Sequence, residues 1–199
     1  TGSLPTALAI ASVTTAVVLT EVPEEPYAAV VAMFVPAAAV LSYRAVNGSW
    51  ASTIALAVYL GTSASFYTLF TAIAALTMVV LAVIHTFTKH SVKPLVHLLV
   101  TGLGSLAIAA ISWGPYVWRV LPGDEQLEST ANHFLPIEGT YFPLPFLSFS
   151  LIGLLSMIGL IYLIYRIKEP ELAALGASIG VCYLWALASM AVTLLGTSL

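Results

Sequence analysis

The sequence predicts an all-α membrane protein, a bundle of about seven transmembrane helices. Of its 199 residues, 60% are hydrophobic and only 8% are charged, and the mean hydropathy is +1.01. Soluble domains carry about 25% charged residues. The chain also contains apolar runs of about 20 residues, the length that crosses the hydrocarbon core of a bilayer. Lipid is therefore expected to cover most of the surface of this protein.

Seven apolar spans follow one another along the chain. They are residues 4–20, 27–43, 50–64, 66–87, 95–114, 146–165 and 172–195. The third and fourth come from one apolar run, 50–88, which as a single helix would measure about 58 Å, twice the hydrocarbon thickness. We therefore divide this run near residues 61–67. The long polar segment 115–145 is predicted to be an extracytoplasmic loop, and the whole chain to be one transmembrane domain.

The distribution of charge supports seven crossings. With seven, five of the six basic residues fall on one side of the membrane: Arg44, Lys89, Lys93, Arg166 and Lys168. Short cytoplasmic loops retain Lys and Arg, so this side is predicted to face the cytoplasm. A single crossing for 50–87 would place Arg44 and Lys89 on opposite sides. Seven of the nine acidic residues then lie outside: Glu21, Glu24, Glu25, Asp124, Glu125, Glu128 and Glu138.

The spans offer little that could carry an ion or form a metal site. No Asp, Glu, Lys or Arg lies in the middle of a span, where ion-coupled carriers place them. His85 and His97 fall near the cytoplasmic ends of their spans, and we expect each to be an interfacial residue with a hydrogen-bond partner. The single Cys182 lies in an apolar run, so neither a disulfide framework nor a metal site is predicted from cysteines.

Carboxylates and aromatic rings gather on the predicted outer face. The candidate substrate-binding residues there are Glu24, Glu25, Tyr27, Tyr67, Tyr116, His133 and Tyr141. Carboxylates accept hydrogen bonds from sugar hydroxyls, and aromatic rings cover the apolar faces of sugars. Interfacial belts of Trp and Tyr, and a solvated acidic face, explain many of the same residues. The pattern alone therefore leaves both interpretations open.

The order of several motifs resembles a known enzyme family. Glu24-Glu25-Pro26-Tyr27 opens a span, Trp113-x-Pro115-Tyr116 follows the fifth span, His133-Phe134-Leu135-Pro136 lies in the long loop, and Tyr183-Leu184-Trp185 lies in the last span. Together these motifs resemble the central membrane region of the galactan arabinofuranosyltransferases of mycobacteria and corynebacteria, the AftA family of GT-C-type glycosyltransferases. The resemblance covers essentially the whole chain.

The resemblance implies a multi-pass enzyme of the bacterial plasma membrane with its active face outside the cytoplasm. Such enzymes are expected to move arabinofuranose from decaprenyl-phosphate arabinose to cell-wall galactan, in one inverting displacement and without a cofactor. The resemblance places Glu25, Tyr27 and His133 at the cavity for the donor phosphate or sugar. It places the catalytic base in an external loop upstream of this chain, so no catalytic residue is assigned and the segment alone is expected to be inactive.

Two other classes of protein remain as alternatives. A small multi-span carrier or channel predicts a polar track through the bilayer. A non-catalytic membrane scaffold predicts that the turn 24–27 lies apart from the loop 115–145, with no shared cavity. The glycosyltransferase predicts instead that these two segments converge at the outer membrane boundary.

Overall fold

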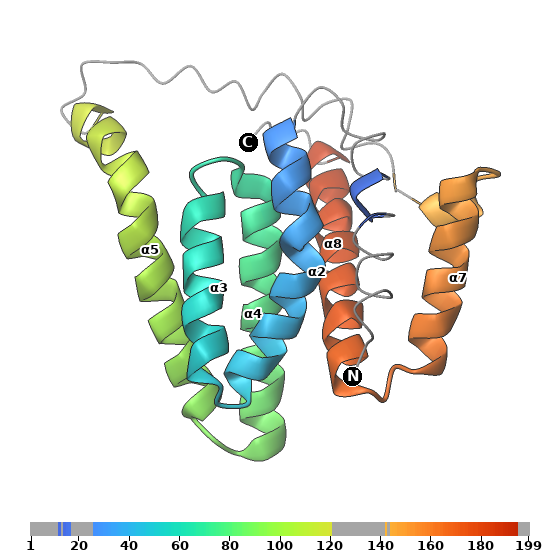
Figure 1. The fold of residues 1–199 in the computed structure, drawn as a ribbon, viewed down its shortest axis with the longest axis horizontal. Coiled ribbons are helices and arrows are strands. Elements are labelled where there is room, and N and C mark those ends of the chain that lie inside the picture. The colour runs from blue at the N-terminus through green and yellow to red at the C-terminus, as the bar shows by residue number, and fades with distance from the viewer. Residues whose placement is uncertain (1–11, 13, 17–25, 121–141, 143, 195–199) are drawn as a thin grey trace.

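The computed structural model describes residues 12, 14–16, 26–120, 142 and 144–194, and every regular element within these ranges is helical (Figure 1). The elements are α2 (Pro26–Val46), α3 (Trp50–Ser63), α4 (Thr68–Lys89), α5 (Lys93–Val120), the 3₁₀ helix η2 (Pro145–Leu147), α7 (Leu151–Tyr165) and α8 (Pro170–Leu194). For the described part of the chain, the predicted all-α class is confirmed. Most of the first span, 4–20, lies outside the described residues.

Three of the helices, α4, α5 and α8, are both long and apolar enough to cross a membrane. The apolar parts of α2 and α7, Val30–Val46 and Leu151–Tyr165, are shorter, and the 14 residues of α3 measure about 21 Å. Large apolar side chains cover the surface of the bundle, among them Ile111, which is 78% exposed, and Trp118, which is 80% exposed. Such a surface would aggregate in water, so the protein is associated with a membrane.

Consecutive helices run in opposite directions, as Figure 1 shows. The α2–α3, α4–α5 and α7–α8 turns lie at one end of the bundle, and the α3–α4 turn and the end of α5 lie at the other. We call the first the basic end, because it holds Arg44, Lys89, Lys93, Arg166 and Lys168. We call the second the aromatic end, because it holds Tyr67, Trp113 and Tyr116.

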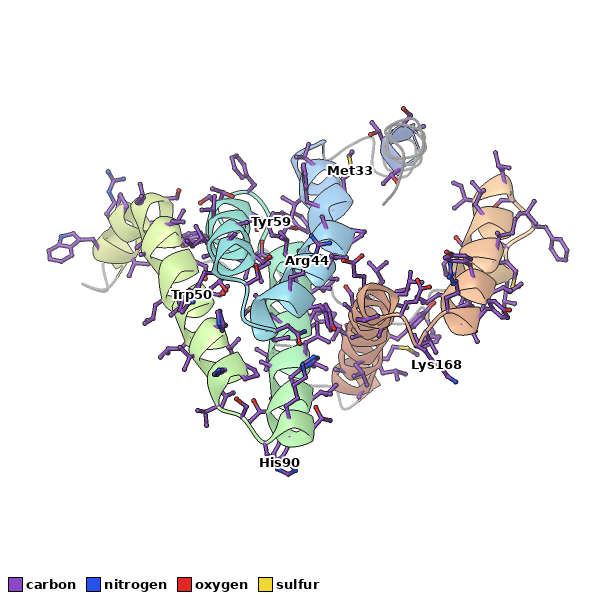
Figure 2. All side chains as sticks on the ribbon, turned by 60° about the horizontal axis from the view of Figure 1, so that its bottom comes forward. Met33, Arg44, Trp50, Tyr59, His90 and Lys168 are labelled. Carbon is purple, nitrogen blue, oxygen red and sulfur yellow. The ribbon has the colours of Figure 1, made fainter. Side chains whose placement is uncertain are left out.

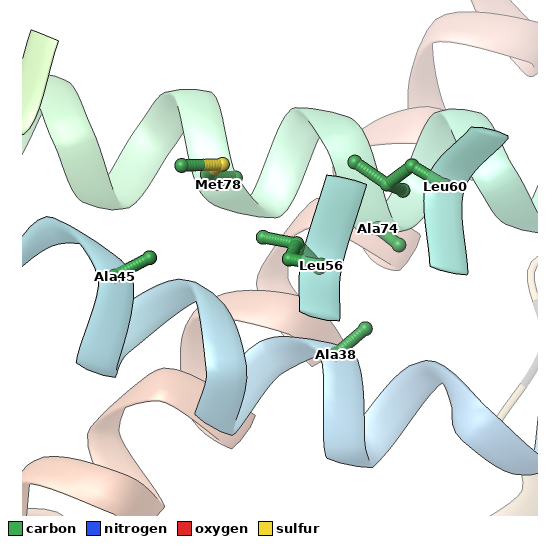
Figure 3. Close-up of a cluster of buried hydrophobic side chains, with 6 residues drawn as sticks. All are labelled: Ala38, Ala45, Leu56, Leu60, Ala74 and Met78. Atoms are coloured by element: carbon green, nitrogen blue, oxygen red, sulfur yellow. The ribbon is translucent and has the colours of Figure 1, made fainter. Parts of the chain in front are cut away.

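The core lies between α2, α3 and α4 (Figure 3). It consists of buried Ala38 and Ala45 from α2, Leu56 and Leu60 from α3, and Ala74 and Met78 from α4. Alanine on α2 lets two neighbouring helices approach closely, and leucine and methionine fill the space between them. A second cluster, which includes Val46, Leu81 and Ala174, attaches α8 to α2 and α4.

Helix α3 packs most closely on α5, and glycine makes this possible. A Cβ atom at Gly61 would lie 2.6 Å from the Ile108 Cβ and 2.8 Å from the Ser105 carbonyl oxygen. A Cβ at Gly104 would lie 3.1 Å from the Ala57 Cβ. The two helices therefore contact each other through backbone, as small residues allow in lipid. Gly102, by contrast, faces open space.

Two helix boundaries differ from the ends of the predicted spans by more than three residues. The fifth span was predicted to end at Gly114, but α5 continues to Val120 with Pro115 inside it. Pro115 removes only one hydrogen bond from the helix, and membrane helices tolerate this loss. Contacts of Ser112 and Trp113 with the α3–α4 turn hold α5 in place at this point. Helix α5 therefore extends into the segment 115–145 that was predicted to be a loop, past Pro115, which had indicated the start of that loop.

The sixth span was predicted to begin at 146, but α7 begins at Leu151. The hydroxyl groups of Ser148 and Ser150 account for the delay: Ser148 Oγ donates to the Pro145 carbonyl oxygen at 2.8 Å, and Ser150 Oγ accepts from the Gly153 N–H at 3.0 Å. Serine side chains that bond to nearby backbone favour caps and turns over helix interiors. The segment also folds back tightly, since a Cβ at Gly153 would lie 2.0 Å from the Ser148 carbonyl oxygen.

Candidate functional site

The candidate substrate-binding residues are only partly within the described structure. Glu24, Glu25, His133 and Tyr141 lie outside the described residues. Tyr27 lies in the first turn of α2, but its side chain is also outside the described part. Tyr67 and Tyr116 are described, and both lie at the aromatic end. Convergence of the turn 24–27 with the loop 115–145 therefore stays a prediction.

Two hydrogen bonds join the α3–α4 turn to the last part of α5. The Trp113 Nε1–H donates to the Ala64 carbonyl oxygen at 3.0 Å, and Ser65 Oγ donates to Ser112 Oγ at 2.9 Å. The turn has a further internal contact, because Thr71 Oγ1 lies 2.8 Å from Ser63 Oγ. The turn and the end of α5 are therefore held to each other by polar contacts.

Aromatic rings surround these polar contacts. Tyr67, at the N-terminus of α4, is half-buried, and its ring centroid lies 5.1 Å from that of Phe70. Tyr116 is 45% exposed and packs edge-on against Trp113, with ring centroids 5.9 Å apart. Exposed rings beside hydroxyl groups can cover the apolar face of a sugar while the hydroxyls bond to its edge. The aromatic end has side chains suited to a polyhydroxylated ligand.

The hydroxyl residues Ser65 and Ser112 were not among the predicted site residues. A signal for Ser65 is present in the sequence, since three of the four residues Thr62-Ser63-Ala64-Ser65, at the break between two apolar spans, carry a hydroxyl group. For Ser112, the neighbouring Trp113 is the only signal. The contact between them depends on the packing of α3 against α5, which local sequence does not specify.

An open apolar hollow of about 680 Å³ lies beside the start of α7. Its lining includes Phe146, Phe149, Leu151, Leu154 and Met157, with hydroxyl groups only from Ser148 and Ser150. The hollow lies along a helix whose outer surface is apolar, since Leu151 and Leu154 are exposed. Its chemistry suits a hydrocarbon chain and not a sugar.

His85 and His97 both have hydrogen-bond partners, as predicted. His97 is buried, its Nδ1 lies 2.7 Å from Thr53 Oγ1, and its ring centroid lies 4.4 Å from that of Trp50. His85 Nδ1 lies 3.0 Å from the Leu81 carbonyl oxygen. The His97 contact joins α5 to α3, and the His85 contact lies within α4.

Polar contacts at the basic end also tie three helices together. Asn47, which follows α2, donates from Nδ2 to the Tyr43 carbonyl oxygen at 2.8 Å and accepts from Lys89 Nζ at the end of α4. Arg44 of α2 forms an ion pair with Glu171 of α8, with Nη2 and Oε1 2.5 Å apart. Both side chains of the ion pair are half exposed, so its contribution to stability is small, about 0–1 kcal/mol.

Comparison with known proteins identifies the family to which this chain is related. The family model described as "Arabinofuranosyltransferase N terminal" matches residues 1–199. A galactan 5-O-arabinofuranosyltransferase of Corynebacterium glutamicum is 49% identical over 200 residues, which cover 100% of this chain and 30% of that protein. Proteins of the same name from Mycolicibacterium smegmatis and Mycobacterium tuberculosis are 34% and 33% identical over 97% of this chain and 32% of their own length.

The chain thus spans about a third of the length of these relatives. The family description names an N-terminal part of such enzymes, whereas the resemblance in the sequence was to their central membrane region. The whole length of the chain takes part in the match, including both described ends of the bundle. The chain belongs to the arabinofuranosyltransferase N-terminal family.

Proposed function

We propose that this chain is the membrane region of a glycosyltransferase that moves arabinofuranose from decaprenyl-phosphate arabinose to cell-wall galactan. The observation that carries the proposal is the 49% identity, over the whole chain, to a galactan 5-O-arabinofuranosyltransferase. Identity of this extent over the whole chain supports a common arrangement of helices in the two proteins. The enzyme lies in the bacterial plasma membrane and crosses it about seven times within this chain, in a GT-C-like bundle.

The aromatic end is the extracytoplasmic, sugar-binding end in this proposal. The cluster of five basic residues at the opposite end supports this orientation, because cytoplasmic loops retain Lys and Arg. The rings and hydroxyls around Tyr67, Trp113 and Tyr116 support its role in binding sugar. The proposed site has further members that are assigned from the sequence pattern alone: Glu24, Glu25, Tyr27, His133 and Tyr141.

The apolar hollow beside α7 is the proposed binding site for the prenyl chain of the donor. It lies near the start of α7, which is at the same end of the molecule as the α3–α4 turn but on the opposite side of the bundle from α5 (Figure 1). A polyprenyl chain would occupy hydrocarbon-like space while its phosphate and sugar remain at the membrane boundary. Donor and acceptor would then meet at the same end of the bundle.

The experiment is a transfer assay with the complete enzyme that carries this chain, purified in detergent or reconstituted in vesicles. Polyprenyl-phosphate arabinose and a galactan oligosaccharide are supplied, and the arabinosylated product is measured by mass spectrometry. Transfer from the lipid-linked donor, and none from a nucleotide-activated arabinose, is expected. Transfer from the nucleotide donor alone, or no transfer to galactan from an enzyme shown to be folded, would contradict the proposal.

A further inference from the structure

The basic end has two corners that carry similar numbers of cations. The α4–α5 corner consists of Lys89, His90, Ser91, Val92 and Lys93, and the α7–α8 corner of Arg166, Ile167, Lys168, Glu169, Pro170 and Glu171. His90 and Lys168 mark the two corners in Figure 2, where they lie well apart. The corners differ in how far their positive charge is neutralised.

The α7–α8 corner carries two carboxylates, Glu169 and Glu171, beside its two cations, Arg166 and Lys168. Arg166 Nη2 lies 2.6 Å from Glu169 Oε1, and Glu171 forms its ion pair with Arg44. These two glutamates are the only acidic residues within the described part of the chain. Between residues 26 and 120 the sequence contains no Asp or Glu at all.

Among the described residues, the α4–α5 corner therefore has no carboxylate of its own to offset its two lysines. Lys89 bonds to Asn47 Oδ1, a neutral amide, so that contact holds the side chain and leaves its charge uncompensated. Lys93 begins α5, whose first turn contains no acidic residue. Both lysines are exposed, and His90 beside them is exposed too.

The backbone of this corner is tightly turned. His90 is in the left-handed region, with φ 48° and ψ 42°, and is the only non-glycine residue with positive φ among the described residues. Ser91 Oγ accepts from the Lys93 N–H at 3.3 Å, and the Val92 carbonyl oxygen accepts from the Leu95 N–H at 3.0 Å. The reversal is short and hydrogen-bonded, so both lysines are presented at the same corner.

Exposed apolar side chains lie directly beside the two lysines. Phe87 is 75% exposed and Val92 is 69% exposed, and Leu95 and Val96 at the start of α5 are 40% and 46% exposed. The corner thus offers cations for a phosphate next to a surface for hydrocarbon. A soluble anion would use only the first of these, and a phospholipid uses both.

We propose that the α4–α5 corner, Lys89–Lys93 with Phe87 and Val96, binds an anionic phospholipid of the cytoplasmic leaflet. The lysines contact the phosphate of the headgroup, and the acyl chains lie against Phe87, Val92 and Val96. Lysine near an anionic membrane surface contributes about a fivefold gain in affinity per residue, so the two together give about 25-fold. The proposal rests on the orientation argued above and does not depend on which sugar the enzyme transfers.

The test uses the complete enzyme in nanodiscs or mild detergent, with lipid adducts counted by native mass spectrometry. Phosphatidylglycerol and phosphatidylcholine with identical acyl chains are offered, and the preference for the anionic lipid is measured. The variant Lys89→Gln/Lys93→Gln is expected to lose this preference by about 25-fold. The control is Arg166→Gln, which removes a cation that already pairs with Glu169, and it is expected to change the preference by less than twofold.

The single variant Lys93→Gln separates a loss of lipid binding from misfolding, because Lys93 takes no part in the contact with Asn47. It is expected to lose about fivefold in preference with an unchanged melting temperature in phosphatidylcholine. Equal losses from the two corners, or a retained preference in Lys89→Gln/Lys93→Gln, would overturn the proposal. A melting temperature that inorganic phosphate raises as much as phosphatidylglycerol does would also overturn it, in favour of a soluble anion. None of these readouts involves arabinose transfer, so the proposed function can fail or hold separately.

Discussion

His97 Nδ1 lies 2.7 Å from Thr53 Oγ1, and this hydrogen bond joins α5 to α3 inside the bundle. Thr53 Oγ1 donates its own hydrogen to the Ser49 carbonyl oxygen at 3.0 Å, so it accepts the one from His97 Nδ1–H. The contact spans 44 positions in the sequence and lies on the face where α3 and α5 pack. It stabilises the helix pair whose other end holds the aromatic residues.

Replacing Thr53 by valine keeps the shape of the side chain and removes the acceptor for His97. The loss leaves a buried ring N–H without its partner, so we expect a destabilisation of about 1–3 kcal/mol. Thermal unfolding in detergent measures it. The control is Thr62→Val, because the Thr62 hydroxyl bonds only to carbonyl oxygens of its own helix, those of Val58 and Tyr59. Equal stability of the two variants would show that the contact with His97 contributes nothing.

Gly61→Ala tests the close approach of α3 and α5. The new Cβ would meet the Ser105 carbonyl oxygen at 2.8 Å, and backbone cannot move aside as a side chain can. We expect a destabilisation of about 1–3 kcal/mol. Gly102→Ala is the matched control, since nothing lies within 4 Å of its Cβ, and alanine favours a helix over glycine by about 1 kcal/mol. A tolerated Gly61→Ala would mean that the two helices are further apart than described.

Cysteine labelling tests the orientation of the bundle. Ser65 lies in the α3–α4 turn and Ser91 in the α4–α5 corner, so single cysteines at these positions report on opposite ends. With Cys182 replaced by alanine, a membrane-impermeant maleimide added to whole cells should label Ser65→Cys. It should label Ser91→Cys only after the cells are permeabilised. The reverse pattern, or labelling of both in intact cells, would contradict the seven-span orientation.

Met157→Trp fills the hollow beside α7. If the prenyl chain lies there, the larger side chain should raise the KM for the lipid-linked donor by about tenfold. The KM for galactan should not change. Ile158→Trp is the control, because Ile158 is 55% exposed and does not line the hollow. A donor KM that is unchanged in Met157→Trp, or raised equally by both variants, would remove the hollow from the donor site.

Sequence alone predicted the helices best where physical limits on length and charge apply. The run 50–88 had to break because one helix of that length would be too long for a bilayer, and the structure places the turn between Ser63 and Thr68. The grouping of Arg44, Lys89 and Lys93 at one end follows from the same argument. These predictions needed no knowledge of which helices pack together.

The late start of α7 has a local cause, the hydrogen bonds of Ser148 and Ser150 to nearby backbone. The other errors and omissions concern contacts between distant parts of the chain. Pro115 indicated the end of a helix by local rules, but α5 continues past it where Trp113 bonds to Ala64, 49 positions away. The sequence predicted a partner for His97 without identifying Thr53, because the partner depends on the packing of α3 against α5. For the same reason the contact between Ser65 and Ser112 was not foreseen.

Arabinose transfer by a Glu25→Gln variant of the complete enzyme tests the central claim most directly. Glu25 lies outside the described residues, and its proposed role in binding the donor at the aromatic end comes from the sequence. We expect a loss of at least tenfold in kcat/KM, which corresponds to one hydrogen bond to a charged group. The matched control is Glu169→Gln at the basic end, where the carboxylate pairs with Arg166, and its transfer rate should equal that of the wild type. An unchanged rate in Glu25→Gln, or an equal loss in both variants, would contradict a sugar-transfer site at the aromatic end.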